Sequence, residues 1–284
     1  MPVWFAGKRY GHGQLSIAPS HPALAYGASV FTTMRVYENS LEHPLTDWGA
    51  HCDRISQSLH LFHWPQPNWP RVTEGCRTML ADYPVLRLAI LADGTELISG
   101  RPLPLNLAQQ QADGVTVWVA QGPQYQRSLP HHKTGNYLPC WLAMQGAQTH
   151  GARDAILSTP AGEWLETSTG NLWGYAQGQW WTPPLASGLL PGISRARLIK
   201  ALLANQTVAE TPWAPDLVGQ FECLAYSNCV VGLMPIHTVL LGNIKLNYSS
   251  THAGLNALRQ MFYRPSMREQ TCLTEPAVQN PEMR

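Results

Sequence analysis

The segment His132-Lys133-Thr134-Gly135-Asn136-Tyr137-Leu138 lies near the middle of the chain, directly after residues 121–130, whose glycine and prolines are typical of a linker. Lysine is rare in this protein, so each one can be judged separately. The other three have ordinary interpretations as solvated charges in a turn or on a helix: Lys8, Lys200 and Lys245. Lys133 alone follows the predicted linker. Taken by itself it also has a surface interpretation, so other segments must decide its role.

Three segments downstream contain polar residues that could take part in a site with Lys133. Leu165-Glu166-Thr167-Ser168-Thr169-Gly170-Asn171 supplies a carboxylate and, five residues later, an asparagine. Leu190-Pro191-Gly192-Ile193-Ser194 runs into a helical pattern, and a helix N-terminus with a hydroxyl can bind an anion. Residues 225–236 contain Ser227-Asn228-Cys229. Glu166 could equally be a solvated turn carboxylate, and Ser194 an ordinary helix cap.

Two segments upstream complete the set. Residues 26–36 contain the strand-like run Phe31-Thr32-Thr33-Met34-Arg35, and Cys52-Asp53-Arg54-Ile55 falls on a predicted amphipathic helix. By periodicity alone, Arg54 is as readily a solvated residue beside Ile55 as a ligand for an anion. Each segment alone is weak evidence for a functional site. Together the six are stronger evidence, because of their order and spacing along the chain.

In that order and spacing, the six segments resemble those of the class IV aminotransferases, the enzymes of pyridoxal-5′-phosphate (PLP) fold type IV. The resemblance covers nearly the whole chain except its last twenty residues. It implies that Lys133 holds PLP as a Schiff base, that Glu166 faces the protonated ring nitrogen, and that Arg54 binds the phosphate. It also implies cofactor contacts from further residues: Tyr137, Asn171, Ile193, Ser194, Asn228 and Cys229. The family often has threonine or serine at the position of Cys229, which puts a hydroxyl contact there in doubt.

Within the family, residues 31–36 and 227–235 resemble 4-amino-4-deoxychorismate lyase. The resemblance implies elimination of pyruvate from 4-amino-4-deoxychorismate to give 4-aminobenzoate, a step of folate biosynthesis. Lys133 would then act as the catalytic base, and Thr32 or Thr33 would orient the departing group or pass it a proton. Asn136-Tyr137 is closer to the aminotransferases, and the loop at residues 92–96 lacks the glycine-rich run expected of the lyase. A class IV aminotransferase of branched-chain or D-amino acids therefore remains an alternative, as does a non-catalytic PLP-binding relative.

Composition limits the other classes of function. The chain has 19 basic and 18 acidic residues, without the basic stripe of a nucleic-acid binder. Charged residues make up 13%, well below the usual ~25%, which favours a homodimer that covers apolar surface. Six scattered cysteines and the lack of any run approaching ~20 apolar residues indicate a cytoplasmic protein outside the membrane. No histidine or cysteine pattern indicates a metal. The expected partners are a small-molecule substrate and a second copy of the chain.

The predicted fold is α+β with two domains. Residues 1–120 are expected to form a smaller N-terminal α/β sandwich-like domain, 121–132 a linker, and 133–264 a larger C-terminal pseudo-barrel domain that binds PLP. Residues 265–284 are expected to be a disordered tail. Strands are predicted at 30–36, 85–91, 115–120, 155–158, 164–165, 172–181, 223–226 and 239–246. Helices are predicted at 48–62, 71–83, 137–147, 194–204 and 251–262. A hairpin is predicted between residues 3–6 and 15–17, across a turn at Gly11-His12-Gly13.

Overall fold

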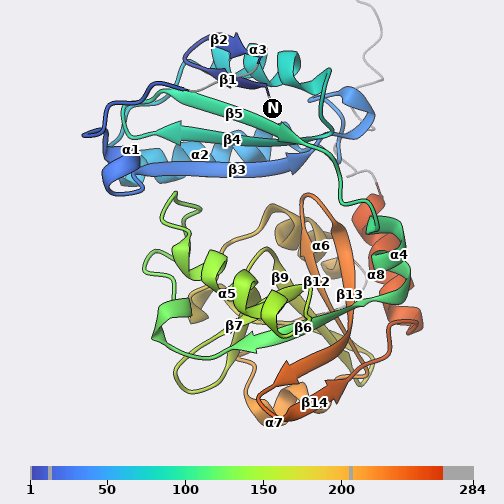
Figure 1. Cartoon of the computed structure of the whole chain (residues 1–284). Helices are drawn as coiled ribbons and strands as arrows, with labels where there is room; N and C mark the ends of the chain where they lie inside the picture. Colours follow the sequence, from blue (N-terminus) through green and yellow to red (C-terminus); the bar gives the residue numbers. More distant parts are fainter. Residues whose placement is uncertain (1, 12–14, 205–206, 265–284) are drawn as a thin grey trace, which may run out of the picture.

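The computed structural model describes residues 2–11, 15–204 and 207–264 and contains two β-sheets. The first is antiparallel, in the order β2-β1-β5-β4-β3 (Figure 1). Its strands are β1 (Val3–Phe5), β2 (Lys8–Tyr10), β3 (Ser29–Arg35), β4 (Val85–Leu91) and β5 (Glu96–Arg101). One face is covered by α2 (Trp48–Leu61) and α3 (Trp69–Leu80), and a short α1 (Pro22–Ala25) precedes β3.

Alternation along β3 sends neighbouring side chains to opposite faces of this sheet. Val30 and Met34 are buried in the core under the helices, together with Leu59 of α2. Phe31 and Thr33 point the other way, toward the second sheet, and line a cavity. The β-branched and aromatic run that predicted this strand therefore packs on both faces of the sheet, in the core under the helices and at the cavity.

The second sheet has nine strands in the order β11-β10-β9-β12-β13-β6-β7-β8, with β14 paired to β13. A further pairing between β8 and β9 closes the path from β9 to β8 into a barrel, which confirms the predicted pseudo-barrel. The strands are β6 (Val115–Ala120), β7 (Asp154–Ser158), β8 (Trp164–Thr167), β9 (Asn171–Ala176), β10 (Gln179–Thr182), β11 (Val208–Glu210), β12 (Cys223–Asn228), β13 (Gly232–Leu241) and β14 (Ile244–Asn247).

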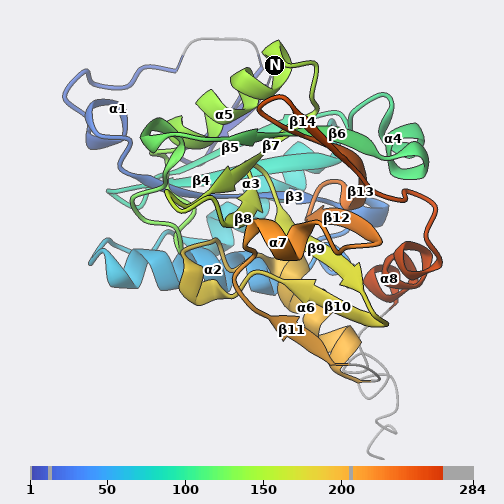
Figure 2. The same ribbon diagram turned by 90° about the horizontal axis from the view of Figure 1, so that it is seen from below.

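Helices surround this barrel (Figure 2). α5 (Leu138–Thr149) packs on β6 and β7, whereas α6 (Ile193–Leu203) and α8 (Ala253–Tyr263) pack on β12 and on each other. Two shorter helices, α4 (Leu107–Asp113) and α7 (Pro215–Val218), lie in connections. None of the helices in the described ranges is long and apolar enough to span a membrane.

Several details differ from the sequence expectation. β5 was not predicted, and each of the predicted strands 172–181 and 239–246 spans two antiparallel strands, β9 with β10 and β13 with β14. β6 belongs to the second sheet, so the chain passes between the sheets at residues 102–106, and residues 121–132 lie within the second unit instead of linking two domains. The N-terminal hairpin joins β1 to β2 through Ala6-Gly7, both with positive φ as a tight two-residue turn requires. Residues 15–17 form no strand, and part of the expected turn (12–14) lies outside the described residues. The expected tail, 265–284, also lies outside them.

Candidate active site

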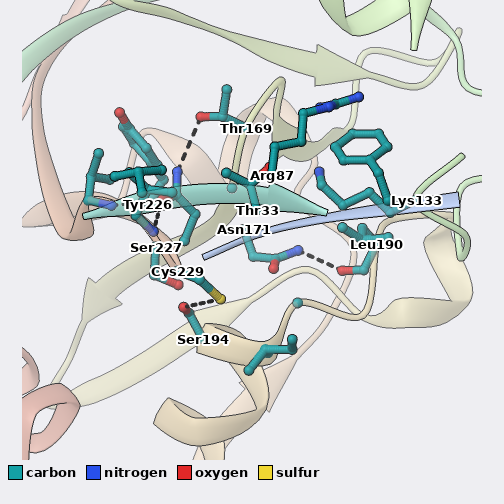
Figure 3. A pocket seen from close by; sticks show the side chains of 18 of the residues that line it. Thr33, Arg87, Lys133, Thr169, Asn171, Leu190, Ser194, Tyr226, Ser227 and Cys229 are labelled. Atoms are coloured by element: carbon teal, nitrogen blue, oxygen red, sulfur yellow. Dashed lines mark hydrogen bonds between the residues drawn. The ribbon is translucent and has the colours of Figure 1, made fainter. Parts of the chain in front are cut away.

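A cavity of about 460 Å³ lies between the mouth of the barrel and the face of the first sheet that α2 and α3 leave uncovered. Phe31, Thr33 and Arg87 line it from β3 and β4. The barrel side supplies Lys133, the turn before α6 and the end of β12, as Figure 3 shows. The segments singled out in the sequence, far apart along the chain, therefore meet around one cavity.

The Lys133 segment is attached to the edge of the first sheet by backbone hydrogen bonds. Phe31 N donates to Lys133 O at 2.8 Å, and Gly135 N donates to Ser29 O at 2.6 Å. Lys133 Nζ donates to Tyr137 Oη at 3.0 Å, and Tyr137 Oη donates to the Ser168 carbonyl at 3.1 Å. The amine also lies 4.7 Å from the centre of the Phe31 ring. These contacts fix the direction of a side chain that would otherwise be mobile.

The amine of Lys133 is unusually ready to lose its proton. Burial, and then the nearby charges of Arg54 and Arg127, lower its pKa from 10.5 to about 7. Half of the amine is therefore neutral near pH 7, whereas an ordinary lysine is almost fully protonated there. A neutral amine is the nucleophile that attacks an aldehyde.

This pKa predicts how the amine reacts as the pH changes. In protein freed of any bound aldehyde, the rate at which Lys133 captures an aldehyde reagent should rise with pH and level off above about 7. The rate can be followed by mass spectrometry after reduction, with Lys133→Ala as the background. A rate that keeps rising to pH ~10 would mean an ordinary, solvated lysine.

Glu166 forms an ion pair that the sequence did not reveal. Arg127 Nη1 donates to Glu166 Oε1 at 2.6 Å, and both side chains are nearly inaccessible, at 9% and 6% exposed. Glu166 Oε2 accepts from Leu190 N at 3.2 Å, and Arg127 Nη2 donates to His132 O at 2.8 Å. Burial raises the pKa of Glu166, and Arg127 opposes that rise. Arg127 was hidden in the stretch interpreted as a linker; its only signal was that it is the sole charged residue of 121–130.

The start of α6 forms a second part of the site. Gly192 is the helix N-cap, so Ile193 and Ser194 are the first helical residues and their backbone N–H groups have no acceptor within the helix. Asn171 Nδ2 donates to Leu190 O at 2.9 Å, and a Cβ at Gly192 would overlap the Asn171 side chain. This close packing holds the turn in place. The result is a helix N-terminus facing the cavity, a site that suits an anion.

The residues of β12 adjoin this turn. Ser194 Oγ donates to Cys229 Sγ at 3.4 Å, and the two side chains point toward each other in Figure 3. Cys229 O accepts from Arg35 N at 3.0 Å, which ties the turn after β12 to β3. Asn228 Oδ1 accepts from Val230 N and Val231 N, both at 2.9 Å, so its amide oxygen stabilises the turn that follows β12.

Arg54 lies at the cavity wall, and Thr32 is buried behind it. Arg54 Nη2 donates to Thr32 Oγ1 at 2.7 Å, and Thr32 Oγ1 also contacts His51 Nδ1 at 2.5 Å. Thr32 is fully buried and does not line the cavity, whereas Thr33 and Arg54 do. Of the two threonines proposed to face a substrate, Thr33 alone is on the cavity wall. Thr32 instead holds Arg54.

The comparisons with known proteins agree with this architecture. The model of the amino-transferase class IV family matches residues 29–239. A branched-chain-amino-acid aminotransferase of Salmonella typhimurium is 24% identical over 223 residues, which cover 70% of this chain and 71% of that protein.

Two solved structures share the fold. A hypothetical aminotransferase from Mycobacterium tuberculosis, in its PLP-bound form, superposes with a TM-score of 0.77 at 18% identity, over 95% of this chain and 100% of that one. A protein provisionally assigned as 4-amino-4-deoxychorismate lyase superposes with a TM-score of 0.70 at 23% identity, over 88% and 95%. With a family model that spans most of its length, the chain belongs to the class IV aminotransferase family.

Proposed function

We propose that the protein is a PLP-dependent enzyme that eliminates pyruvate from 4-amino-4-deoxychorismate to yield 4-aminobenzoate. The residues present fit the cofactor. Arg54 forms no ion pair with any described residue, and its buried Nε has no hydrogen-bond partner among them, as expected of a cation that awaits an anion. Arg54, Ser194 and the first N–H groups of α6 would hold the phosphate.

The other end of the cofactor would lie between Lys133 and Glu166. Lys133 would hold the aldehyde carbon, with Tyr137 beside it, and Glu166 would keep a proton on the ring nitrogen. When bound, PLP supplies an electron sink for the carbon that carries the substrate nitrogen. Arg127 keeps Glu166 in place and balances its charge.

The hydrogen bond between Thr32 and Arg54 predicts how replacing Thr32 changes the affinity for PLP. Thr32→Val removes the hydroxyl that accepts from Arg54 and should weaken PLP binding roughly three- to tenfold, since one hydrogen bond is worth ~0.5–1.5 kcal/mol. Thr32→Ser keeps the oxygen and should bind PLP almost as the native protein does. Both affinities can be measured by fluorescence titration of the cofactor-free protein. Equal affinities for the valine and serine variants would mean that Thr32 has no part in holding Arg54.

The positive charge of the cavity is the observation that supports this substrate. Arg87, Arg101 and Arg153 line it, and none forms an ion pair with a described residue. Glu166 is the one acidic group among the described lining residues, and it is already paired with Arg127. Such an excess of positive charge suits a substrate with several carboxylates. 4-Amino-4-deoxychorismate has two.

The protein's own groups then divide the work. The arginines orient the substrate by its carboxylates. With the cofactor bound, the neutral amine of Lys133 would be the base that takes the proton from the carbon that bears the substrate nitrogen. Thr33, on the cavity wall, orients the departing enolpyruvyl group or gives it a proton. Loss of that group makes the ring aromatic, which drives the reaction forward.

The second candidate is amino transfer, favoured by the branched-chain aminotransferases among the relatives. The lyase hypothesis predicts that kcat/KM for 4-amino-4-deoxychorismate exceeds that for leucine plus 2-oxoglutarate and for D-alanine plus 2-oxoglutarate. The three can be compared with one enzyme preparation. If either amino-acid pair is preferred by ~tenfold, about 1.4 kcal/mol of transition-state stabilisation, the protein is an aminotransferase.

We also propose that the protein acts as a cytoplasmic homodimer. Leu138 and Trp141 of α5 are 57% and 50% exposed, an arrangement that a second copy could cover. The low fraction of charged residues supports the same proposal.

A further inference from the structure

The first sheet forms a roof over the cavity, and its register fixes where each roof residue lies. Thr33 pairs with Arg87, and Arg87 pairs with Ser99, so these three form one row across β3, β4 and β5. Arg101 lies in the next row on the same face, opposite Val85. All five side chains line the cavity.

Arg101 is far from the reacting amine. Lys133 contacts Phe31, which pairs with Ala89 of β4, four residues along that strand from Val85. At ~3.3 Å per residue and ~4.8 Å between strands, Arg101 begins more than ~10 Å from the Lys133 end of the cavity. Arg87 lies between, with its guanidinium carbon 3.4 Å from the centre of the Phe31 ring. The roof therefore places one cation close to the amine and another at a distance.

Arg153 lies across the cavity from the roof, in the residue before β7. Its backbone N donates to Thr116 O at 2.8 Å, and its Nε donates to Gln110 Oε1 at 3.3 Å. Arg101 and Arg153 line the same cavity, and burial, and then the charge of Arg153, lower the pKa of Arg101. The neighbouring carboxylate, Asp154, accepts instead from the Ser168 and Thr169 hydroxyls.

We propose that Arg101 and Arg153 form a subsite for a second carboxylate of the substrate, remote from the amine that reacts at Lys133. Two guanidinium groups without an acidic partner among the described residues favour an anion between them, and each can bind a carboxylate by two parallel hydrogen bonds. The subsite selects dicarboxylates over monocarboxylates. It rests on the proposed function only in that the substrate amine reacts at Lys133.

Binding of unreactive acids to the cofactor-loaded protein tests the subsite without turnover. Isophthalate has two carboxylates and benzoate has one, and neither has an amine. By calorimetry the native protein should bind isophthalate at least tenfold more tightly than benzoate. In Arg101→Gln/Arg153→Gln the affinity for isophthalate should fall roughly tenfold, with little change for benzoate, whereas Arg101→Lys should retain part of the preference.

A matched control removes a charge outside the cavity. Lys245→Gln, on the exposed β14, should leave both affinities unchanged. The proposal is overturned if the native protein does not prefer isophthalate, or if the double variant loses affinity for both acids equally or for neither. Because neither acid reacts, this result is independent of whether the enzyme proves to be a lyase or an aminotransferase.

Discussion

Replacing Lys133 with alanine is expected to lower kcat/KM by at least ~10³-fold. The variant loses both the amine that would hold the cofactor and the base that would move the substrate proton. In the native protein the pKa of the Lys133 amine is about 7, which suits this amine to both tasks near neutral pH. No other lysine among the described residues lines the cavity, so none can replace it.

The control for this variant is Lys200→Ala, which removes an exposed lysine of α6. It should keep native activity, and circular dichroism should show both variants folded. Lys133→Arg keeps the positive charge but should be as inactive as the alanine variant, because guanidinium does not lose its proton. Activity of Lys133→Ala within tenfold of the native protein would contradict the assignment.

Glu166→Gln is expected to slow turnover roughly ten- to a hundredfold, since a charge-assisted contact of ~1.5–3 kcal/mol is lost where the reaction needs it. Glutamine keeps the size of the side chain but cannot hold a proton on the ring nitrogen. It also leaves Arg127 buried without its partner. PLP should still bind, because the amine of Lys133 and the anion site at α6 are unchanged.

Two control variants test whether the loss of activity is specific to the carboxylate of Glu166. Glu166→Asp keeps the charge and should lie between glutamine and the native enzyme. Glu163→Gln removes a carboxylate just before the same strand, outside the cavity, and should be neutral. The visible absorption of bound cofactor reports that each variant is loaded. A loaded Glu166→Gln enzyme with native rates would show that Glu166 does not act on the ring.

Local patterns predicted most elements of this fold. The strand at 85–91 is exact, and α2 and α6 begin and end within one residue of their predicted limits. Apolar periodicity is strong in these segments, because each buries one face. β5 was missed, since Glu96–Arg101 mixes charged, apolar and glycine residues. The boundary between sheets was misplaced because a glycine- and proline-rich stretch can be a loop inside a domain as well as a linker.

The site was harder to predict than the fold. The motifs identified residues that meet at one cavity, but not which side of a strand each occupies in three dimensions. Thr32 and Thr33 are neighbours with the same chemistry, and the register of β3 sends one behind Arg54 and the other to the cavity. Arg127 had no local signal beyond being the sole charged residue of 121–130, since its partner Glu166 lies 39 residues away, and Arg101 had none.

The most direct test of the account is to reduce the purified, PLP-loaded protein with borohydride and map its peptides. Reduction fixes the cofactor permanently to the amine that holds it. The pyridoxyl mass should appear on the peptide that contains Lys133, at close to one per chain. A label on Lys8, Lys200 or Lys245 instead, or no label with PLP supplied in excess, would contradict it.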